Sequence, residues 1–525
     1  MIKNFYFNWY SFNVEILCYR IFFKMNATES EKRIFNFLQL QNCCLRCCFR
    51  FVGWRTLDCY EDPIKYAKDA GYIKAEDISF NDEIPCITCL GILQNKTQEQ
   101  VIGKIQVEVD KQNYDSGTFI CALTVPVCIS VRERFLHIQC ATQLNLSEDA
   151  LLDFKVKLQS VKDVWKWIMT PKLELAIKKQ ADSMTPSPFL IEIILTYKFN
   201  EKECETLLLC KGTNNTGNKW KRKYNENRFS RKSIETLMTK IIDKEFFQYF
   251  KAVSFNTSDS INIENIICSH SSIFIGGRYN KLSRELSQTP WFINGEKKMQ
   301  TSVQDILCNP IAEVTKAQSI KFLSSGREDV DVRNIYSGRP FAVELINPRM
   351  TKITEELLSN LVNKINQSSK QVQITSNLKV LSKYDLKRLK EGENVKTKFY
   401  RALCVCRNAS KNVLSLEKLN DLKRVKIIQK TPVRVLHRRP LSPRERLIYE
   451  MRARWVEPQE LKKLNITTED ASMFFVLDIK TQAGTYVKEF VHGDFGRTKP
   501  SLCDILNVEI DIVALDVTGI NLNWP

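Results

Sequence analysis

The chain has 525 residues, 43% hydrophobic and 26% charged, a composition that excludes a chain unable to bury a core. This length exceeds what one hydrophobic core supports, so we expect two or more domains. The net charge of +18 and the isoelectric point near 9.1 favour a polyanionic partner, nucleic acid first, over an enzyme that is merely basic.

Residues 1–24 are apolar and aromatic, but polar and charged residues interrupt them too often for a membrane span or a secretory signal. We interpret this segment as an extension. Met25 is an alternative start of the protein, in which case residues 1–24 would not be native. A weak organelle-targeting helix is a second interpretation. Eighteen cysteines in a long chain without a signal indicate reduced thiols, and hence a cytoplasmic or nuclear protein with no membrane partner.

Residues 29–53 are predicted to form a helix that leads into a cysteine cluster. Cys44 and Cys47 form one CxxC knuckle, and Cys86 and Cys89 form a second. Four such thiolates complete the tetrahedral shell of a structural Zn²⁺. Cys43 and Cys48 leave open which sulfurs are used, and unligated buried cysteines are the alternative.

A zinc nucleobase deaminase is a rival interpretation of the same region. Cys59-Tyr60-Glu61, followed by Cys86 and Cys89, matches the outline of a zinc site beside a general acid/base glutamate. That arrangement assigns no role to Cys44 and Cys47.

The remainder of the first half is predicted to be mixed α and β. Residues 60–140 combine short helical and β-branched runs, and residues 145–182 show helical spacing with Ser147 as a cap. A strand over 191–199, an exposed basic loop over 211–232 with three aromatic residues, and a helix near 231–250 follow. We place the domain boundary between residues 260 and 275.

The second half alternates strands with helices. Strands are predicted over 341–346, 371–381, 398–406, 426–436, 474–480 and 509–517, and helices over 353–366, 383–390 and 444–454. Few long crossovers separate the strands, so we expect an α+β domain on a largely antiparallel mixed sheet with flanking helices. The stretch 423–454 holds eleven Lys or Arg against two Glu, with aromatic residues at its edge. Such a run fits phosphates and unpaired bases of RNA, although a solvated surface explains either basic run taken alone.

One carboxylate lies in a context suited to chemistry. Asp329 follows Ser325-Gly-Arg and precedes an alternating segment that is predicted to be a strand. The acid would thus be held at the edge of a sheet. His residues are few and scattered, and no P-loop, dinucleotide fingerprint or nucleophile elbow is present.

The sequence resembles the archaeal and eukaryotic tRNA pseudouridine synthase family that modifies the T-arm. Matching segments, from about residue 25 to the end, are Gly277-Arg-Tyr-Asn280, Gln288-Thr-Pro-Trp291, Ser325-Gly-Arg-Glu-Asp-Val-Asp-Val-Arg333, Gly338-Arg-Pro-Phe341, Lys430-Thr-Pro432, Val435-Leu-His-Arg-Arg-Pro440 and the stretch 480–500. The cysteine knuckles resemble the family's N-terminal half.

The resemblance implies a fold, a reaction and a set of site residues. Residues 25–268 would be a zinc-containing, THUMP-type RNA-binding domain, and residues 269–525 the pseudouridine synthase domain. The enzyme would isomerise uridine to pseudouridine at positions 54 and 55 of tRNA, as a monomer and without a catalytic cofactor. By the same analogy Asp329 is the nucleophile, while Tyr400 and Tyr486 line the uridine pocket.

The chemistry agrees with this assignment. Breaking the N-glycosidic bond and forming a C–C bond at the same sugar needs an anionic acid and a closed pocket. A nearby cation would keep the acid ionised, so Arg327 and Lys488 are predicted to support Asp329, and Lys488 is predicted to pair with it. Surface positions for the lysine and core packing for the tyrosines are the alternatives.

A function of another class stays open. The basic runs and the zinc knuckles equally fit a non-catalytic, zinc-braced RNA-binding adaptor in tRNA or microRNA processing. Other structured RNA could also be bound. The intact Gly-Arg-Glu-Asp-Val-Asp segment favours the enzyme.

Overall fold

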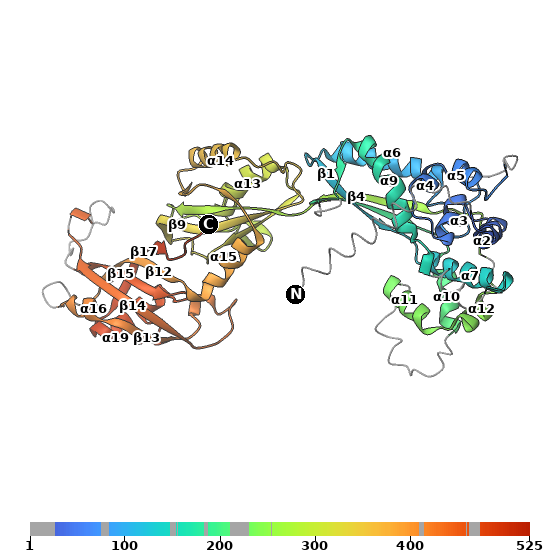
Figure 1. The fold of residues 1–525 in the computed structure, drawn as a ribbon. Helices are drawn as coiled ribbons and strands as arrows, with labels where there is room; N and C mark the ends of the chain where they lie inside the picture. Colours follow the sequence, from blue (N-terminus) through green and yellow to red (C-terminus); the bar gives the residue numbers. More distant parts are fainter. Residues whose placement is uncertain are drawn as a thin grey trace, which may run out of the picture. The chain divides into compact units, whose positions relative to one another are not determined.

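The computed structural model describes residues 27–74, 83–146, 154, 156–182, 187–210, 230–251, 253, 255–408, 414–457, 459–460 and 473–525. The extension 1–24 lies outside them. The chain divides into two compact units, Met1–Ser269 and His270–Pro525 (Figure 1). Both units combine helices and strands, which confirms the α+β class. No helix in the described ranges has the length and apolar character needed to cross a bilayer.

The first unit packs helices around a four-stranded sheet of order β2-β1-β3-β4, in which β1 pairs with β3 in parallel. Along β3 every second residue is buried, as expected of a strand with one covered face. The elements are α2 (Glu29–Leu40), α3 (Leu45–Val52), α4 (Asp58–Glu61), α5 (Pro63–Asp69), α6 (Asn95–Gln112), β1 (Thr118–Thr124), α7 (Cys128–Gln143), α9 (Val161–Ile177), β2 (Gln180–Ala181), β3 (Phe189–Thr196), α10 (Asn200–Cys210), α11 (Arg231–Lys240), α12 (Asp243–Phe250) and β4 (Asn262–His270).

The helix predicted over 145–182 is interrupted. Residues 154, 156 and 157 are helical, residues 158–160 are not, and α9 begins after Ser160, whose hydroxyl accepts from the backbone N–H groups of Lys162 and Asp163. A local N-cap thus starts a new helix within the segment that the apolar spacing indicated as one. Ser147 and most of the basic loop, residues 211–229, lie outside the described residues.

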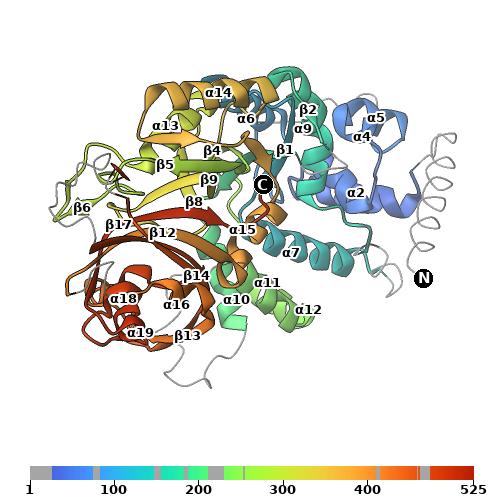
Figure 2. The same ribbon diagram turned by 90° about the vertical axis from the view of Figure 1, so that its left-hand side faces the viewer.

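The second unit is built on an eleven-stranded sheet with the main order β10-β5-β9-β17-β12-β15-β14-β13-β16. Helices α13 and α14 lie beside the β5 end, and α18 and α19 lie near β13 (Figure 2). The elements are β5 (Ile273–Lys281), β6 (Phe292–Ile293), β7 (Glu296–Lys297), α13 (Val303–Thr315), β8 (Ser319–Ser324), β9 (Arg333–Ile346), α14 (Glu355–Ser368), β10 (Val372–Ile374), β11 (Lys379–Leu381), α15 (Lys383–Val395), β12 (Thr397–Cys406), α16 (Glu417–Asp421), β13 (Lys423–Gln429), η1 (Val433–Val435), β14 (Arg444–Trp455), β15 (Phe474–Gln482), α18 (Val487–His492), β16 (Thr498–Lys499), α19 (Leu502–Leu506) and β17 (Ile510–Ile520).

The helix predicted over 444–454 is wrong, because this segment is strand β14. It pairs antiparallel with both β13 and β15. Ile448 and Met451 are both buried although they are three residues apart, a spacing typical of a helix. A register shift between Ile448 and Glu450 places both side chains toward the core.

The Asp329 carboxylate lies near the place where two parts of this sheet meet. Strands β9 and β17 pair in parallel there, with Arg333 opposite Asp516, while the other pairings described within the sheet are antiparallel. Separate hydrophobic clusters flank this pair, one around β5, β9 and α14 and the other around β12, β15 and α18. The loop from β8 to β9, which carries Asp329, therefore enters the sheet at the seam between two cores.

Candidate active site and metal site

The loop that carries Asp329 starts with a left-handed glycine. Gly326 has a φ of +88°, and a Cβ atom there would lie 2.9 Å from Lys398 Nζ and 3.1 Å from Arg339 Nη1. Glycine adopts this backbone conformation without strain and leaves room for both cations. The loop backbone before Asp329 therefore lies against two basic side chains.

Glu328, the residue before Asp329, is the centre of a buried polar network. Its Oε2 atom lies 2.6 Å from Arg339 Nε, and both side chains are at most 1% exposed. Tyr279 donates its hydroxyl hydrogen to Oε1 over 2.8 Å, and Gln288 Nε2 lies 3.1 Å from Oε2. Burial raises the pKa of Tyr279 well above its usual range, so its hydroxyl stays a donor at neutral pH. The network fixes the backbone from which Asp329 projects.

Four sequence motifs meet in this network. Each supplies one member: Tyr279 from Gly277–Asn280, Gln288 from Gln288–Trp291, Glu328 from Ser325–Arg333, and Arg339 from Gly338–Phe341. Their convergence is visible only in the tertiary structure.

The Lys281 side chain forms hydrogen bonds to the backbone of the same loop. Its Nζ atom donates to the carbonyl oxygens of Leu286, Asp329 and Val330 over 2.7, 3.0 and 2.6 Å. The residue is fully buried. Burial lowers its pKa to about 8, against the opposing effect of nearby carboxylates such as Glu328.

The Asp329 carboxylate itself pairs with Arg434, which follows β13 in the short helix η1. Arg434 Nη1 lies 2.7 Å from Asp329 Oδ2, and Arg434 Nε lies 2.6 Å from Glu489 Oε1. The Arg434 guanidinium also lies 5.9 Å from the centre of the Tyr486 ring. One guanidinium thus contacts Asp329 and Glu489 and lies near Tyr486.

The predicted pair between Lys488 and Asp329 is wrong. Lys488 Nζ lies 2.6 Å from Asp331 Oδ2 instead. The segment around Lys488 is not a strand but helix α18, which is capped by Tyr486. Partial burial acts to raise the pKa of Asp331, but the hydrogen bond and charge of Lys488 outweigh it and lower that pKa.

A cavity of about 680 Å³ brings the predicted site residues together. Asp329, Tyr400 and Tyr486 line it, as do the two predicted supporting cations, Arg327 and Lys488. These residues come from the β8–β9 loop, from β12 and from the start of α18. The cavity thus exposes the Asp329 carboxylate and two aromatic rings to one space, and its volume is large enough for a nucleoside.

The cavity is strongly positive. Besides Glu328 and Asp329 its charged lining is cationic: Arg327, Arg339, Lys396, Lys398, Arg434, Arg438, Arg439, Arg444, Arg446 and Lys488. Such a concave basic surface attracts polyanions. Burial raises the pKa of Tyr400 to about 12, so its ring remains a neutral phenol.

Sequence reasoning missed three residues that hold the acid. Arg434 lies between two matching segments, Lys430–Pro432 and Val435–Pro440, and received no role, and Lys281 directly follows a matching motif. Glu489 is buried behind Arg434, and only its position beside Lys488 could have drawn attention to it. A buried acid cannot be distinguished from a surface acid by residue type alone.

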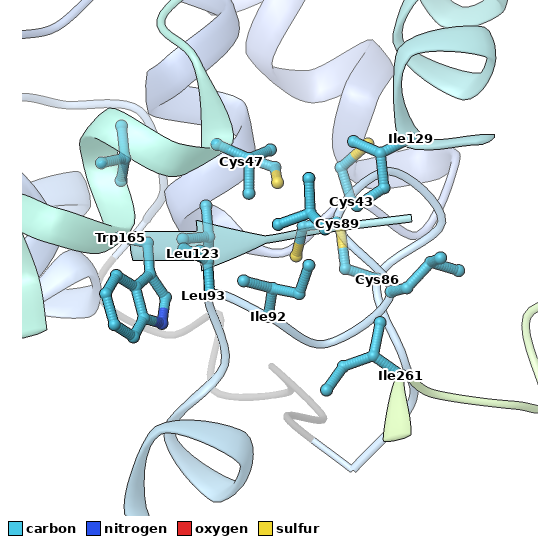
Figure 3. Packing of buried hydrophobic residues seen from close by; sticks show 14 of the residues in the cluster. Cys43, Cys47, Cys86, Cys89, Ile92, Leu93, Leu123, Ile129, Trp165 and Ile261 are labelled. Carbon is cyan, nitrogen blue, oxygen red and sulfur yellow. The ribbon is translucent and has the colours of Figure 1, made fainter. Parts of the chain in front are cut away.

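The four predicted metal ligands form one cluster in the first unit. The sulfur atoms of Cys44, Cys47, Cys86 and Cys89 all lie within 4.8 Å of one another. Cys44 caps α3, Cys47 lies in its first turn, and Cys86 and Cys89 come from the turn before α6. Figure 3 shows Cys47, Cys86 and Cys89 among the buried apolar side chains that enclose the cluster.

This donor set fits a tetrahedral metal ion. Four sulfurs at about 2.3 Å from one Zn²⁺ are roughly 3.8 Å apart, and the Cys44 and Cys89 sulfurs are 3.9 Å apart. The Cys44 backbone N–H also points at the Cys86 sulfur over 3.3 Å. Cys59 is outside this cluster and donates to the Thr56 carbonyl oxygen, so the deaminase outline is not assembled.

Family models match both units. The model described as "Pus10, C-terminal" matches residues 274–521, and "Eukaryotic Pus10, N-terminal" matches residues 86–268. These ranges cover the cavity and, in the first unit, the second cysteine knuckle.

Curated relatives match over most of the chain. "tRNA pseudouridine synthase Pus10" of Xenopus laevis is 36% identical, over 84% of this chain and 81% of the relative. The Homo sapiens protein of the same name is 35% identical, over 84% and 79%. That of Thermofilum pendens is 34% identical, over 47% and 53%. Among solved structures, a chain of a Cbf5-Nop10-Gar1 complex has a TM-score of 0.24 at 12% identity, over 46% of this chain and 49% of that chain, too low to support an argument.

Proposed function

The chain belongs to the Pus10 family of tRNA pseudouridine synthases, and we propose that it converts uridine to pseudouridine at positions 54 and 55 in the T-arm of tRNA. As a pseudouridine synthase it is an isomerase. The reaction breaks the C1′–N1 bond and forms a C1′–C5 bond at the same ribose; N1 gains a proton and C5 loses one. Neither an oxidant nor a group donor is consumed.

Asp329 is the proposed nucleophile. Its side chain is 34% exposed toward the cavity, while Arg434 holds one carboxylate oxygen at 2.7 Å. The other oxygen is left to meet the substrate. An ionised carboxylate in this position can attack ribose or uracil, or can stabilise the charge that develops at the sugar.

Tyr400 and Tyr486 are the proposed uridine-binding residues. A uridine that leaves its stack loses base–base contacts, and an aromatic ring replaces them. Both rings line the cavity with Asp329. The supporting roles go to Arg327 and Lys488, with Lys488 acting through Asp331.

The basic lining supports an RNA substrate larger than a nucleoside. Ten cations against two acids suit the phosphates of a folded RNA, so other structured RNA can also compete for this surface. A cytoplasmic or nuclear location is proposed with it, since tRNA is made and used in these compartments.

A structural Zn²⁺ in the first unit completes the proposal. Cys44, Cys47, Cys86 and Cys89 would hold it in a closed four-sulfur shell, which stabilises a fold and leaves no position for a substrate. The surrounding unit would be the THUMP-type RNA-binding domain. Zinc supplies no chemistry to the cavity, which is lined wholly by residues of the second unit.

The observation that carries the proposal is that Asp329, Tyr400 and Tyr486 line the same basic cavity. The test uses an unmodified tRNA transcript with both uridines, together with transcripts in which uridine 54, uridine 55 or both are replaced by cytidine. Pseudouridine is mapped chemically at single-nucleotide resolution. Wild-type protein is expected to modify both sites. Asp329→Asn is expected to bind the transcript with nearly unchanged affinity and to form no product.

Asp331→Asn is the matched control, because it changes a carboxylate two residues away that pairs with Lys488. It is expected to retain measurable product formation. Full activity of Asp329→Asn would refute the assignment of Asp329 as the nucleophile. Wild-type protein that binds tRNA but forms no pseudouridine would instead support the adaptor.

A further inference from the structure

Phe495 is an aromatic side chain held almost wholly in water. It is 95% exposed, more than any other large apolar side chain in the described part of the chain. It lies in the turn between α18 and β16, within the 480–500 stretch. Neither the cavity nor a hydrophobic core uses it.

The backbone of this turn is strained at two residues. Asp494, Phe495 and Gly496 have φ values of +47°, +55° and +77°. A left-handed conformation is ordinary for glycine, tolerated by aspartate and unfavourable for phenylalanine. Such strain persists where surrounding contacts impose it, and it concentrates at functional sites.

Specific hydrogen bonds hold the turn at Asp494–Gly496 in this strained conformation. The Asp494 carboxylate accepts from the Val433 backbone N–H over 3.2 Å, and its carbonyl oxygen accepts from the Arg497 N–H over 3.1 Å. The Arg497 side chain donates to the Thr431 carbonyl oxygen over 2.7 and 3.0 Å. The turn is therefore fastened to the segment 430–436 and keeps the ring outside.

That segment leads directly to the active site. Val433 precedes Arg434, which pairs with Asp329. Arg438 and Arg439, a few residues further on, line the cavity. Phe495 thus belongs to the same fastened pair of loops as the cavity rim.

The two fastened loops carry exposed cations. Lys430, Arg438, Arg439 and Lys499 are all exposed, and none has an ion pair with a residue that the structure describes. Lys499 Cε lies 3.8 Å from the position of a Cβ atom on Gly496, next to the ring. The acid of the turn, Asp494, is buried and already bonded.

We propose that Phe495 stacks on an unpaired base of the substrate RNA outside the cavity, while the neighbouring cations contact the phosphates on either side. The inference rests on the proposed function, because it assigns a second contact to the same RNA. An exposed aromatic ring on loops that carry exposed cations matches the way single-stranded RNA is held. Lys430 and Lys499 disfavour a protein partner or a second copy of this chain, because the cores of protein interfaces are depleted in lysine.

The test compares Phe495→Ala, Phe495→Gly and Phe495→Trp by fluorescence anisotropy with a labelled T-arm stem–loop and by single-turnover pseudouridine formation. Alanine and glycine are expected to raise Kd about tenfold, and tryptophan is expected to retain wild-type affinity. Glycine relieves the left-handed strain, so its melting temperature should not fall below that of wild type.

Salt dependence separates stacking from charge. The slope of log Kd against log salt should be unchanged in Phe495→Ala and should decrease by roughly 1 in Arg439→Ala. Tyr384→Ala is the matched control, because it removes an aromatic ring that is 68% exposed on α15 of the same unit. It is expected to bind like wild type.

The outcomes separate the two proposals. Wild-type protein without pseudouridine formation refutes the proposed function, whatever the Phe495 variants do. Active wild type with unchanged Kd in Phe495→Ala overturns the stacking role. Weak binding in Phe495→Gly accompanied by a lower melting temperature would show a folding role and would also overturn it.

Discussion

Arg434 connects Asp329 to Glu489. Its Nη1 atom lies 2.7 Å from the Asp329 carboxylate, which is 34% exposed, and its Nε atom lies 2.6 Å from the Glu489 carboxylate, which is 2% exposed. The buried acid thereby fixes the guanidinium plane, and the plane orients the acid that faces the cavity. Two ion pairs on one planar group are more directional than a single point charge.

Arg434→Lys tests this relationship. Lysine keeps the charge but cannot hold both acids in a fixed geometry, so we expect the single-turnover rate to fall roughly 10²-fold. The Kd for tRNA should change little, because the total charge is the same. Arg438→Lys is the control within the same segment, and a rate for Arg434→Lys within threefold of wild type would contradict the prediction.

The Glu328–Arg339 pair should govern the stability of the second unit. Glu328→Gln leaves the Arg339 guanidinium buried without a counter-charge, which costs about 3–5 kcal/mol. Urea unfolding followed by a probe in His270–Pro525 measures this loss. The double variant Glu328→Gln, Arg339→Met should recover part of it, whereas a loss below about 1 kcal/mol would show that the pair is dispensable.

Lys281 should make stability depend on pH. The folded protein releases its proton near a pKa of about 8, whereas the unfolded chain holds it to about 10.4. Between these values the unfolded state binds more protons, so the stability of wild type relative to Lys281→Met should rise as pH rises. The rise is limited to about 3 kcal/mol. Urea titrations of both proteins at pH 7.5 and pH 10 measure it, and a difference that shrinks at pH 10 would contradict the assignment.

The metal assignment predicts that neighbouring cysteines behave differently. Cys44→Ser should lose the bound zinc measured by elemental analysis and should lower the melting temperature, because it removes one of four ligands. Cys43→Ser is the control: Cys43 is buried and bonds to Thr88, but it is not one of the four sulfurs. Equal zinc contents in the two variants would refute the assignment of these four cysteines as the zinc ligands. Chelation of wild type should reproduce the effect of Cys44→Ser.

Most local features follow from patterns within single segments. Most strand positions from Phe341 onward, the α+β class and the acid just before β9 could be predicted, since apolar alternation and turn residues are short-range signals. The segment 444–454 could not, because the register shift that buries Ile448 and Met451 depends on the partner strands. The family resemblance also pointed to the two tyrosines and the carboxylate that line one cavity.

Which cation meets which acid was decided by tertiary structure alone. Lys488 lies within a sequence motif and Arg434 between two motifs, and both line the cavity. Only the turn of α18 and the position of η1 direct Lys488 to Asp331 and Arg434 to Asp329. A pairing depends on distances of a few ångströms between segments more than a hundred residues apart, whereas residue chemistry and spacing report only on neighbours along the chain. For the same reason, the contacts of four motifs at Glu328 cannot be predicted from the sequence and are seen only in the folded chain.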